Sequence, residues 1–169
     1  MNNIEIIEIH KMNDVYLEGL SSLLIDVVDN GASVGFLSPL ILEDAKSYWK
    51  EVLQNKGVIL WVAVIAGHIV GAIQLYLCQK QNGKHRGEIA KLIVHSKARR
   101  MGIGKDLIKL AEERARKEGL KLLTLDTRGG DVSNLLYKAR GYIEAGRIPK
   151  YAQSSNGELH ETVLYYKMI

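Results

Sequence analysis

The hydrophobic pattern of the chain changes at Val58, and this change limits the folds that the chain can adopt. Before Val58, apolar residues recur every three or four positions in two long stretches, which predicts two helices. After Val58 come short β-rich runs, divided by turn signals and by two further helical stretches. The pattern predicts strands at 4–9, 58–65, 69–79, 87–94, 121–126, 142–151 and 159–168, and helices at 14–30, 43–56, 102–118 and 133–139.

The order of these elements predicts the fold class. Along the chain it is β-α-α-β-β-β-α-β-α-β-β, an antiparallel meander that leads into a strand–helix–strand unit. An Asn82-Gly83 pair predicts a tight hairpin turn inside the meander. The sequence has 169 residues, two prolines and no internal repeat or linker-like stretch, which indicates one domain over 1–169. We therefore expect a single mixed α/β domain.

Composition excludes several classes of protein. Hydrophobic residues make up 47% and charged residues 25% of the chain, as in globular proteins. The longest apolar run, 58–66, has nine residues, whereas a membrane helix needs about 20. The segment Met1–Glu5 has no basic stretch followed by an apolar core, so we expect no secretory signal.

The single cysteine and the five scattered histidines predict neither a disulfide nor a metal site. A free thiol at Cys78 fits the reducing cytosol, so we expect a cytoplasmic protein. The net charge of +4 suits an anionic ligand. Aromatic and basic residues are not interleaved as they are in single-strand binders, so we expect neither nucleic acid nor a membrane as partner.

One motif suggests a hydrolase. Residues 31–35 read G-x-S-x-G, and Asp126 and His160 follow Ser33 in the order of a catalytic triad. A nucleophile elbow needs a strand before it and a helix after it. Here a helical stripe precedes Gly31 and no helix opens after Gly35, which favours a helix end followed by a loop.

A second motif, Gly102-Ile103-Gly104, resembles the start of a dinucleotide-binding fingerprint. The third glycine of that fingerprint is replaced by Leu107, and Gly102 lies eight residues beyond Val94, too far for a tight strand-to-helix turn. The pair of glycines is therefore a weak signal by itself.

The whole stretch 88–104 is more informative. An apolar strand is followed by a basic loop and an amphipathic helix. Glycines let the backbone approach a ligand, helix-start amides attract anions, and Arg99, Arg100 and Lys105 add positive charge. These features indicate a cradle for a pyrophosphate, with a solvated basic turn as the alternative.

At this point the sequence resembles the GCN5-related N-acetyltransferase family. Residues 99–104 resemble its R/Q-x-x-G-x-G/A acetyl-CoA loop, 67–71 resemble its G-x-x-V-G hairpin, and 137–142 resemble its Y-x-x-x-G-F/Y signature. These elements follow one another in the family's order over about 58–145. The resemblance implies a single-domain α/β fold with a mixed, mostly antiparallel sheet flanked by helices and with splayed central strands.

A narrower resemblance concerns residues 31–36, 77–80 and 159–167, which look similar to acetyltransferases of the tabtoxin-resistance type. That type acetylates a small amino-acid-like toxin, which implies a role in resistance. One departure from the wider family is Gly130, where many members carry an asparagine. Asn134 lies nearby in a different register.

The family resemblance also implies site residues. The tetrahedral oxyanion would be stabilised by a backbone N–H near Ile93 or Val94, and Tyr137 would protonate the departing thiolate. The base that deprotonates the amine is either Glu88 or Asp126, and the sequence leaves both open. Residues expected to contact acetyl-CoA are Leu92, Ile93, Val94, Arg99, Arg100, Met101, Gly102, Ile103, Gly104, Lys105, Asn134 and Tyr137.

The acceptor is expected between the Gly31–Leu40 loop and the Tyr151–His160 turn, in contact with Ser33, Tyr151 and His160. The implied function is direct transfer of an acetyl group from acetyl-CoA, without a metal, to the amine of a small molecule by a monomer or homodimer. The alternatives are a protein or peptide N-acetyltransferase, a catalytically idle acyl-CoA-binding protein, and a serine hydrolase that uses Ser33.

Overall fold

The computed structural model describes residues 3–169, so Met1 and Asn2 of the segment inspected for a secretory signal lie outside the described residues. The predicted order of strands and long helices is confirmed. The elements are β1 (Glu5–Glu8), α1 (Asp14–Asp29), α2 (Leu42–Val52), β2 (Val58–Ile65), β3 (His68–Leu77), η1 (Gln81–Gly83), β4 (Arg86–Val94), η2 (Ser96–Ala98), α3 (Ile103–Lys117), β5 (Leu122–Arg128), α4 (Ser133–Ala139), β6 (Ile143–Gln153) and β7 (Leu159–Met168).

One helix end and the form of one hairpin connection differ from the prediction. Helix α2 ends at Val52, four residues earlier than expected, because the side-chain amides of Gln54 and Asn55 bond to carbonyl oxygens of its last turn and end it. The hairpin predicted at Asn82-Gly83 is confirmed, since β3 and β4 pair antiparallel, but the connection is longer than a two-residue turn. The pair lies in the short 3-10 helix η1, which closes with a hydrogen bond from the Gly83 N–H to the Lys80 carbonyl.

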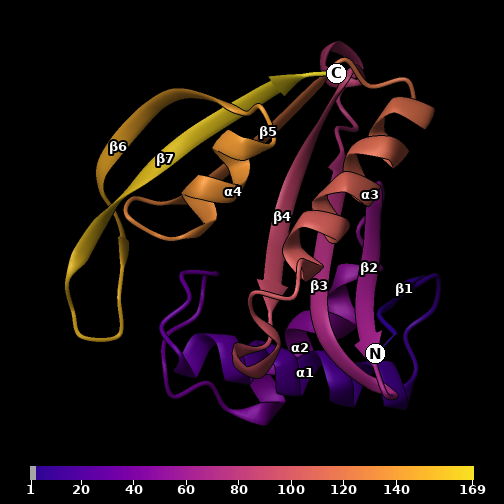
Figure 1. Ribbon diagram of the computed structural model, residues 1–169, viewed down its shortest axis with the longest axis vertical. Coiled ribbons are helices and arrows are strands. Elements are labelled where there is room, and N and C mark those ends of the chain that lie inside the picture. The colour runs from indigo at the N-terminus through magenta and orange to yellow at the C-terminus, as the bar shows by residue number, and fades with distance from the viewer. Residues whose placement is uncertain (1–2) are drawn as a thin grey trace.

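The seven strands form one sheet in the order β1-β2-β3-β4-β5-β7-β6. All neighbouring pairs are antiparallel except β4 and β5, which are parallel. The β4–β5 ladder covers only Arg86–Glu88 against Leu122–Thr124, and beyond it the two strands diverge (Figure 1). The expected mixed, mostly antiparallel sheet with splayed central strands is therefore confirmed.

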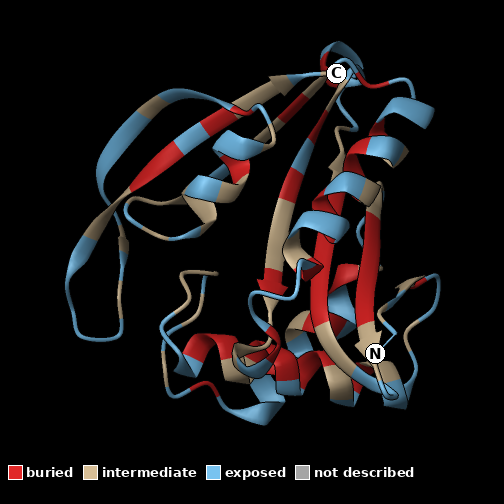
Figure 2. Cartoon of the chain, in the orientation of Figure 1, coloured by how far each residue is buried: buried red, intermediate tan, exposed pale blue. Residues whose placement is uncertain are grey.

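Helices cover both faces of the sheet. Residues of β2 alternate between two cores: Trp61 packs with α3, and Leu60 packs with α1 and α2. Figure 2 shows the buried residues along β2, β3 and the inner side of α3, whereas β6 is mostly exposed. Among residues 3–169, no helix is long and apolar enough to cross a membrane.

Strand β4 carries a bulge near the point where it leaves β5. Ala72 pairs with Ile93 and Gln74 pairs with Ala90, so Lys91 and Leu92 together face a single residue of β3. Lys91 has a φ of 50°, in the left-handed region that side-chain-bearing residues rarely adopt. A bulge changes the direction in which the side chains of a strand point, and this one lies beside the splay.

Candidate functional site

The loop before α3 is built to receive an anion. Gly102, at the N-cap of α3, has a φ of 82°, and a Cβ added there would meet no atom within 4 Å. The first backbone N–H groups of α3 have no acceptor within the helix and point outward. Arg99, Arg100 and Lys105 are exposed, and no carboxylate of the described residues pairs with them. The partial positive charge of the helix N-terminus and the full charges of these three side chains therefore lie at the same end of α3.

This loop lies against the end of β4 and against α4. A Cβ on Gly104 would lie 3.5 Å from Leu136 Cδ2 and 3.9 Å from Val94 Cγ2, so a larger side chain would fill this junction. Leu92 and Val94 pack on the α3 side of the sheet, and the Ile93 side chain is buried on the opposite side. Of the remaining predicted cofactor residues, Ile103 is buried and Met101 is 43% exposed.

Asn134 is placed differently from the prediction. Its amide N–H groups donate to the carbonyl oxygens of Arg128 and Asp131, at 2.9 and 2.8 Å, and its Oδ1 accepts from the Tyr165 hydroxyl. Both donors of the side chain are thus used within the protein. The geometry gives Asn134 the task of holding the β5–α4 connection, which leaves no amide N–H for coenzyme A.

Tyr137 projects from α4 into a cluster of aromatic rings with Tyr142 and Tyr165, at centroid distances of 5.9 and 6.0 Å. The residue is buried, but its hydroxyl has no hydrogen-bond partner among residues 3–169. Burial raises the pKa of Tyr137, and the nearby charge of Asp126 raises it further. The phenol therefore keeps its proton at neutral pH and can donate it.

The two candidate bases lie on either side of the splay. Glu88 is the last residue of β4 paired with β5, opposite Thr124, and Asp126 follows two positions further along β5. Thr162 Oγ1 donates to Asp126 Oδ2 at 2.9 Å. Glu88 is accessible to solvent, yet loss of hydration and the charge of Asp126 raise the pKa of its carboxyl above its ordinary value. The structure brings both carboxylates together and leaves the choice between them open.

A cavity of about 490 Å³ lies between the α1–α2 loop, the end of β5 and the β6–β7 hairpin. It has the size of a small-molecule site. Ser33 and His160 line its wall, as do Phe36 and Arg128. Tyr151, the third residue predicted to contact an acceptor, is 58% exposed and lies outside this wall.

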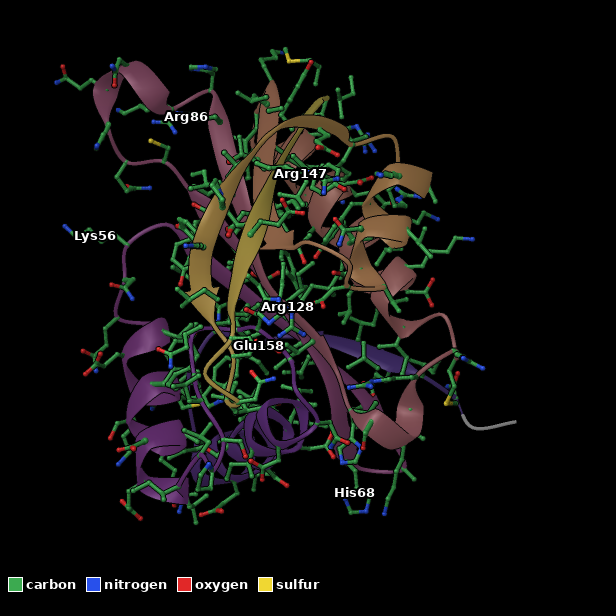
Figure 3. All side chains as sticks on the ribbon, turned by 90° about the vertical axis from the view of Figure 1, so that its left-hand side faces the viewer. Lys56, His68, Arg86, Arg128, Arg147 and Glu158 are labelled. Atoms are coloured by element: carbon green, nitrogen blue, oxygen red, sulfur yellow. The ribbon has the colours of Figure 1, made fainter. Side chains whose placement is uncertain are left out.

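Arg128 joins the three walls of the cavity. Its guanidinium donates to Asp131 Oδ1 at 2.9 Å, to Ser154 Oγ at 3.1 Å and to the Gly31 carbonyl oxygen at 2.9 Å. Figure 3 shows Arg128 beside Glu158 near the tip of the hairpin, with Arg147 further along the same hairpin. This role could not be predicted from the sequence, because two of the partners of Arg128, Gly31 and Ser154, lie far from it along the chain.

The hydrolase interpretation finds no support in this arrangement. Residues 31–35 lie in a loop between two helices, so Ser33 is not on a strand-to-helix turn. Ser33 and His160 share a cavity wall, but among residues 3–169 no hydrogen bond joins them, and Asp126 bonds to Thr162 instead. Within the described part of the chain, no group of three or more histidine, cysteine or acidic side chains could hold a metal.

Further polar residues near the splay were missed at the level of sequence. Buried Gln74 of β3 bonds to two tyrosine hydroxyls, those of Tyr48 and Tyr76, at 3.0 and 2.8 Å. Lys91 places its Nζ 5.5 Å from the centroid of the Tyr48 ring. The only sequence signal for this cluster is a lysine between the apolar residues 89–90 and 92–94 of β4.

Comparisons with known proteins identify relatives of this chain. The model of the acetyltransferase (GNAT) family matches residues 37–142. An uncharacterised N-acetyltransferase of Azospirillum brasilense is 30% identical over 130 residues, which are 76% of this chain and 77% of that protein.

Two solved structures are similar in fold. The ribosomal-protein-alanine N-acetyltransferase of Brucella melitensis gives a TM-score of 0.80 at 23% identity, covering 96% of this chain and 99% of that one. An acetyltransferase of Salmonella typhimurium, solved with its cofactor acetyl-CoA, gives a TM-score of 0.77 at 15% identity, covering 99% and 94%. At these identities the likeness concerns the fold.

Proposed function

Because the chain belongs to the acetyltransferase (GNAT) family and is therefore an acyltransferase, we propose that it transfers the acetyl group of acetyl-CoA directly to the amine of a small molecule. The observation that carries this proposal is the divergence of β4 from β5. At that opening the charge of Asp126 acts on the carboxyl of Glu88 and on the phenol of Tyr137, so the three groups lie near one another.

The start of α3 is the proposed site of acetyl-CoA, which supplies an acetyl group activated as a thioester. The free N–H groups of its first turn and the side chains of Arg99, Arg100 and Lys105 would hold the phosphates. Beyond Glu88, no strand of residues 3–169 pairs with the β5-facing edge of β4, so a backbone N–H near Ile93 or Val94 is available for the acetyl oxygen. We leave Asn134 out of this set.

Acid–base chemistry falls to the residues at the opening. An aliphatic ammonium has a pKa near 10 and cannot attack a carbonyl until it loses a proton. Glu88 or Asp126 takes that proton, directly or through a water. Tyr137, whose pKa is raised by burial, returns a proton to the departing thiolate. Cys78 lies just after β3 and has no part in the transfer.

The cavity beside Arg128 is the proposed entrance for the acceptor. Ser33 and His160 lie in its wall, and its volume suits a small molecule. The resemblance to the tabtoxin-resistance type leads us to propose an amino-acid-like acceptor and a role in resistance. We further propose that residues 1–169 act as one N-acetyltransferase domain in the cytoplasm, as a monomer or homodimer.

Two measurements test the proposal in sequence. Thermal unfolding with acetyl-CoA, and with NAD as control, tests the cradle: a ligand at 100 times its Kd adds about 2.7 kcal/mol, several degrees in Tm for a domain of this size. Thiol release with a panel of small amines and a panel of peptides then identifies the acceptor class. No stabilisation by acetyl-CoA would remove the proposal, and transfer to peptides alone would move the acceptor to the protein class.

A further inference from the structure

Buried Gln74 determines the direction of the hydrogen bonds in the polar cluster of Tyr48, Gln74, Tyr76 and Lys91. Gln74 Nε2 donates to the Tyr48 hydroxyl, and the Tyr76 hydroxyl donates to Gln74 Oε1. The Tyr48 hydroxyl thus accepts from Gln74 and keeps its own proton for another partner. The Tyr76 hydroxyl uses its proton on Gln74 and keeps lone pairs for another partner. Gln74 therefore leaves the Tyr48 hydroxyl as a donor and the Tyr76 hydroxyl as an acceptor for further partners.

A positive charge lies beside Tyr48, the donor of the two tyrosines. The Lys91 ammonium lies over the Tyr48 ring, and a Cβ on Gly35 of the α1–α2 loop would lie 3.8 Å from it. Among residues 3–169 no carboxylate lies within the 4.0 Å that defines an ion pair with Lys91. Burial lowers the pKa of Lys91, and the more distant charges of Asp126 and Glu88 oppose that shift. A partly desolvated cation without a direct counter-ion attracts an anion.

Negative charge lies beside Tyr76, the acceptor of the two tyrosines. Tyr76 offers its lone pairs beside Glu88, whose charge contributes to the raised pKa of that tyrosine. Glu88 and Asp126 together make this side of the cluster a site for an ammonium group. The cluster adjoins the proposed entrance: Phe36 lines the cavity, and its ring packs edge-on against that of Tyr48 at a centroid distance of 5.3 Å.

We propose that Lys91 and Tyr48 bind an anionic group of the acceptor, so that the preferred acceptor is an amino acid or a similar amine that carries a free carboxylate. This inference rests on the proposed function and names its substrate class. The carboxylate accepts from the Lys91 ammonium and the Tyr48 hydroxyl, while the amine of the same molecule faces Glu88 and Asp126. An amine without an anionic group would leave the lysine unpaired and would be repelled by it.

The test uses pairs of acceptors that differ only in the anionic group: the common amino acids and their carboxamides. The variants are Lys91→Met, which keeps an unbranched side chain at the left-handed position, and Lys84→Met, which removes the same charge from an exposed site after η1. For the wild type we expect kcat/KM to favour the free acid by roughly 10- to 100-fold, as for a charge-assisted hydrogen bond. Lys91→Met should lose this preference through KM, and Lys84→Met should keep it.

A binding measurement makes the outcome independent of turnover. Calorimetric titration with N-acetylated amino acids and with their carboxamides should show tighter binding of the acid to the wild type and to Lys84→Met, with no difference for Lys91→Met. Equal binding of acid and amide to the wild type, or no binding of either, overturns the inference. Efficient acetylation of amines without a carboxylate also overturns it and leaves the proposed function intact, whereas lack of stabilisation by acetyl-CoA overturns the proposed function itself.

Discussion

Arg128 Nη2 donates a hydrogen bond to the carbonyl oxygen of Gly31 at 2.9 Å, and so joins the end of β5 to the end of α1 across 97 positions of sequence. With its bonds to Asp131 and Ser154, this contact fixes the width of the cavity. Arg128, whose side chain is only 20% exposed, therefore holds the hairpin against the α1–α2 loop together with the hydrogen bond from the Ser38 N–H to Ser155 Oγ.

Replacing Arg128 should loosen the cavity without disturbing the donor site. We expect Arg128→Met to lower the free energy of unfolding by about 1–2 kcal/mol, since three hydrogen bonds of a mostly buried cation are lost. KM for the acceptor should rise, and affinity for acetyl-CoA should stay the same. Urea denaturation and steady-state kinetics measure both effects.

The matched control is Arg147→Met on the same hairpin. Arg147 is exposed, pairs with Glu144 and Glu161, and lies outside the cavity wall. Exposed ion pairs contribute little, so this variant should resemble the wild type. Equal effects of the two substitutions would show that Arg128 has no special part in the cavity.

The variant Tyr137→Phe tests whether Tyr137 donates the proton to the departing thiolate. Loss of a positioned proton donor should lower kcat by roughly 100-fold and leave the Kd for acetyl-CoA nearly unchanged. Tyr142→Phe removes a hydroxyl from the neighbouring ring, one without a hydrogen-bond partner among residues 3–169, and should keep kcat. Collapse of acetyl-CoA affinity with normal turnover in Tyr137→Phe would contradict the assignment.

The pH dependence of kcat/KM distinguishes Glu88 from Asp126. A base acts only when deprotonated, so activity falls as pH drops through its pKa. Burial and Asp126 hold the pKa of Glu88 above its ordinary value of 4.5. If Glu88 is the base, Glu88→Gln lowers kcat by about 100-fold, and Asp126→Asn moves the acidic limb to lower pH because it removes the neighbouring charge.

The reverse pattern would assign the base to Asp126: a large loss of kcat in Asp126→Asn and a mild effect in Glu88→Gln. Wild-type rates in both variants across the pH range would exclude both carboxylates. Circular dichroism of each variant shows whether a loss of rate reflects chemistry or unfolding.

Gly102→Ala tests the cradle at the start of α3. A side chain at a φ of 82° costs about 1–2 kcal/mol of stability, although open space surrounds the position. Gly67→Ala in the β2–β3 turn is matched in both respects, with a φ of 79° and open space. Chemical denaturation should show similar losses, and only Gly102→Ala should weaken acetyl-CoA binding. Equal affinities in the two variants would place the phosphates elsewhere.

The order of elements could be predicted because the chain marks its helix ends directly. Gly31 and Gly119 follow α1 and α3 closely, and both adopt a positive φ, whereas Gly57 lies five residues beyond the end of α2. The closeness of the basic loop 99–105 to the start of α3 could be predicted because these residues are contiguous in sequence.

The polar cluster at the splay could not be predicted. Its residues Tyr48, Gln74 and Lys91 come from separate elements. The direction of the Lys91 side chain depends on a bulge that cannot be recognised from the residue types. The position of Tyr151 outside the cavity wall could not be predicted either, because the register of β6 against β7 shifts between Ile148 and Ala152. Alternation along the strand therefore does not say which residues of the hairpin reach the cavity.

The divergence of β4 from β5 has a kinetic consequence. The anion-binding start of α3 lies on one face of the sheet, and Tyr48 and Lys91 lie on the other, so two ligands approach the opening from opposite faces. Neither ligand must depart before its counterpart arrives, and the protein has no need to carry the group covalently between them. Initial velocities plotted as double reciprocals should give intersecting lines, as for a ternary complex, and not the parallel lines of a ping-pong reaction.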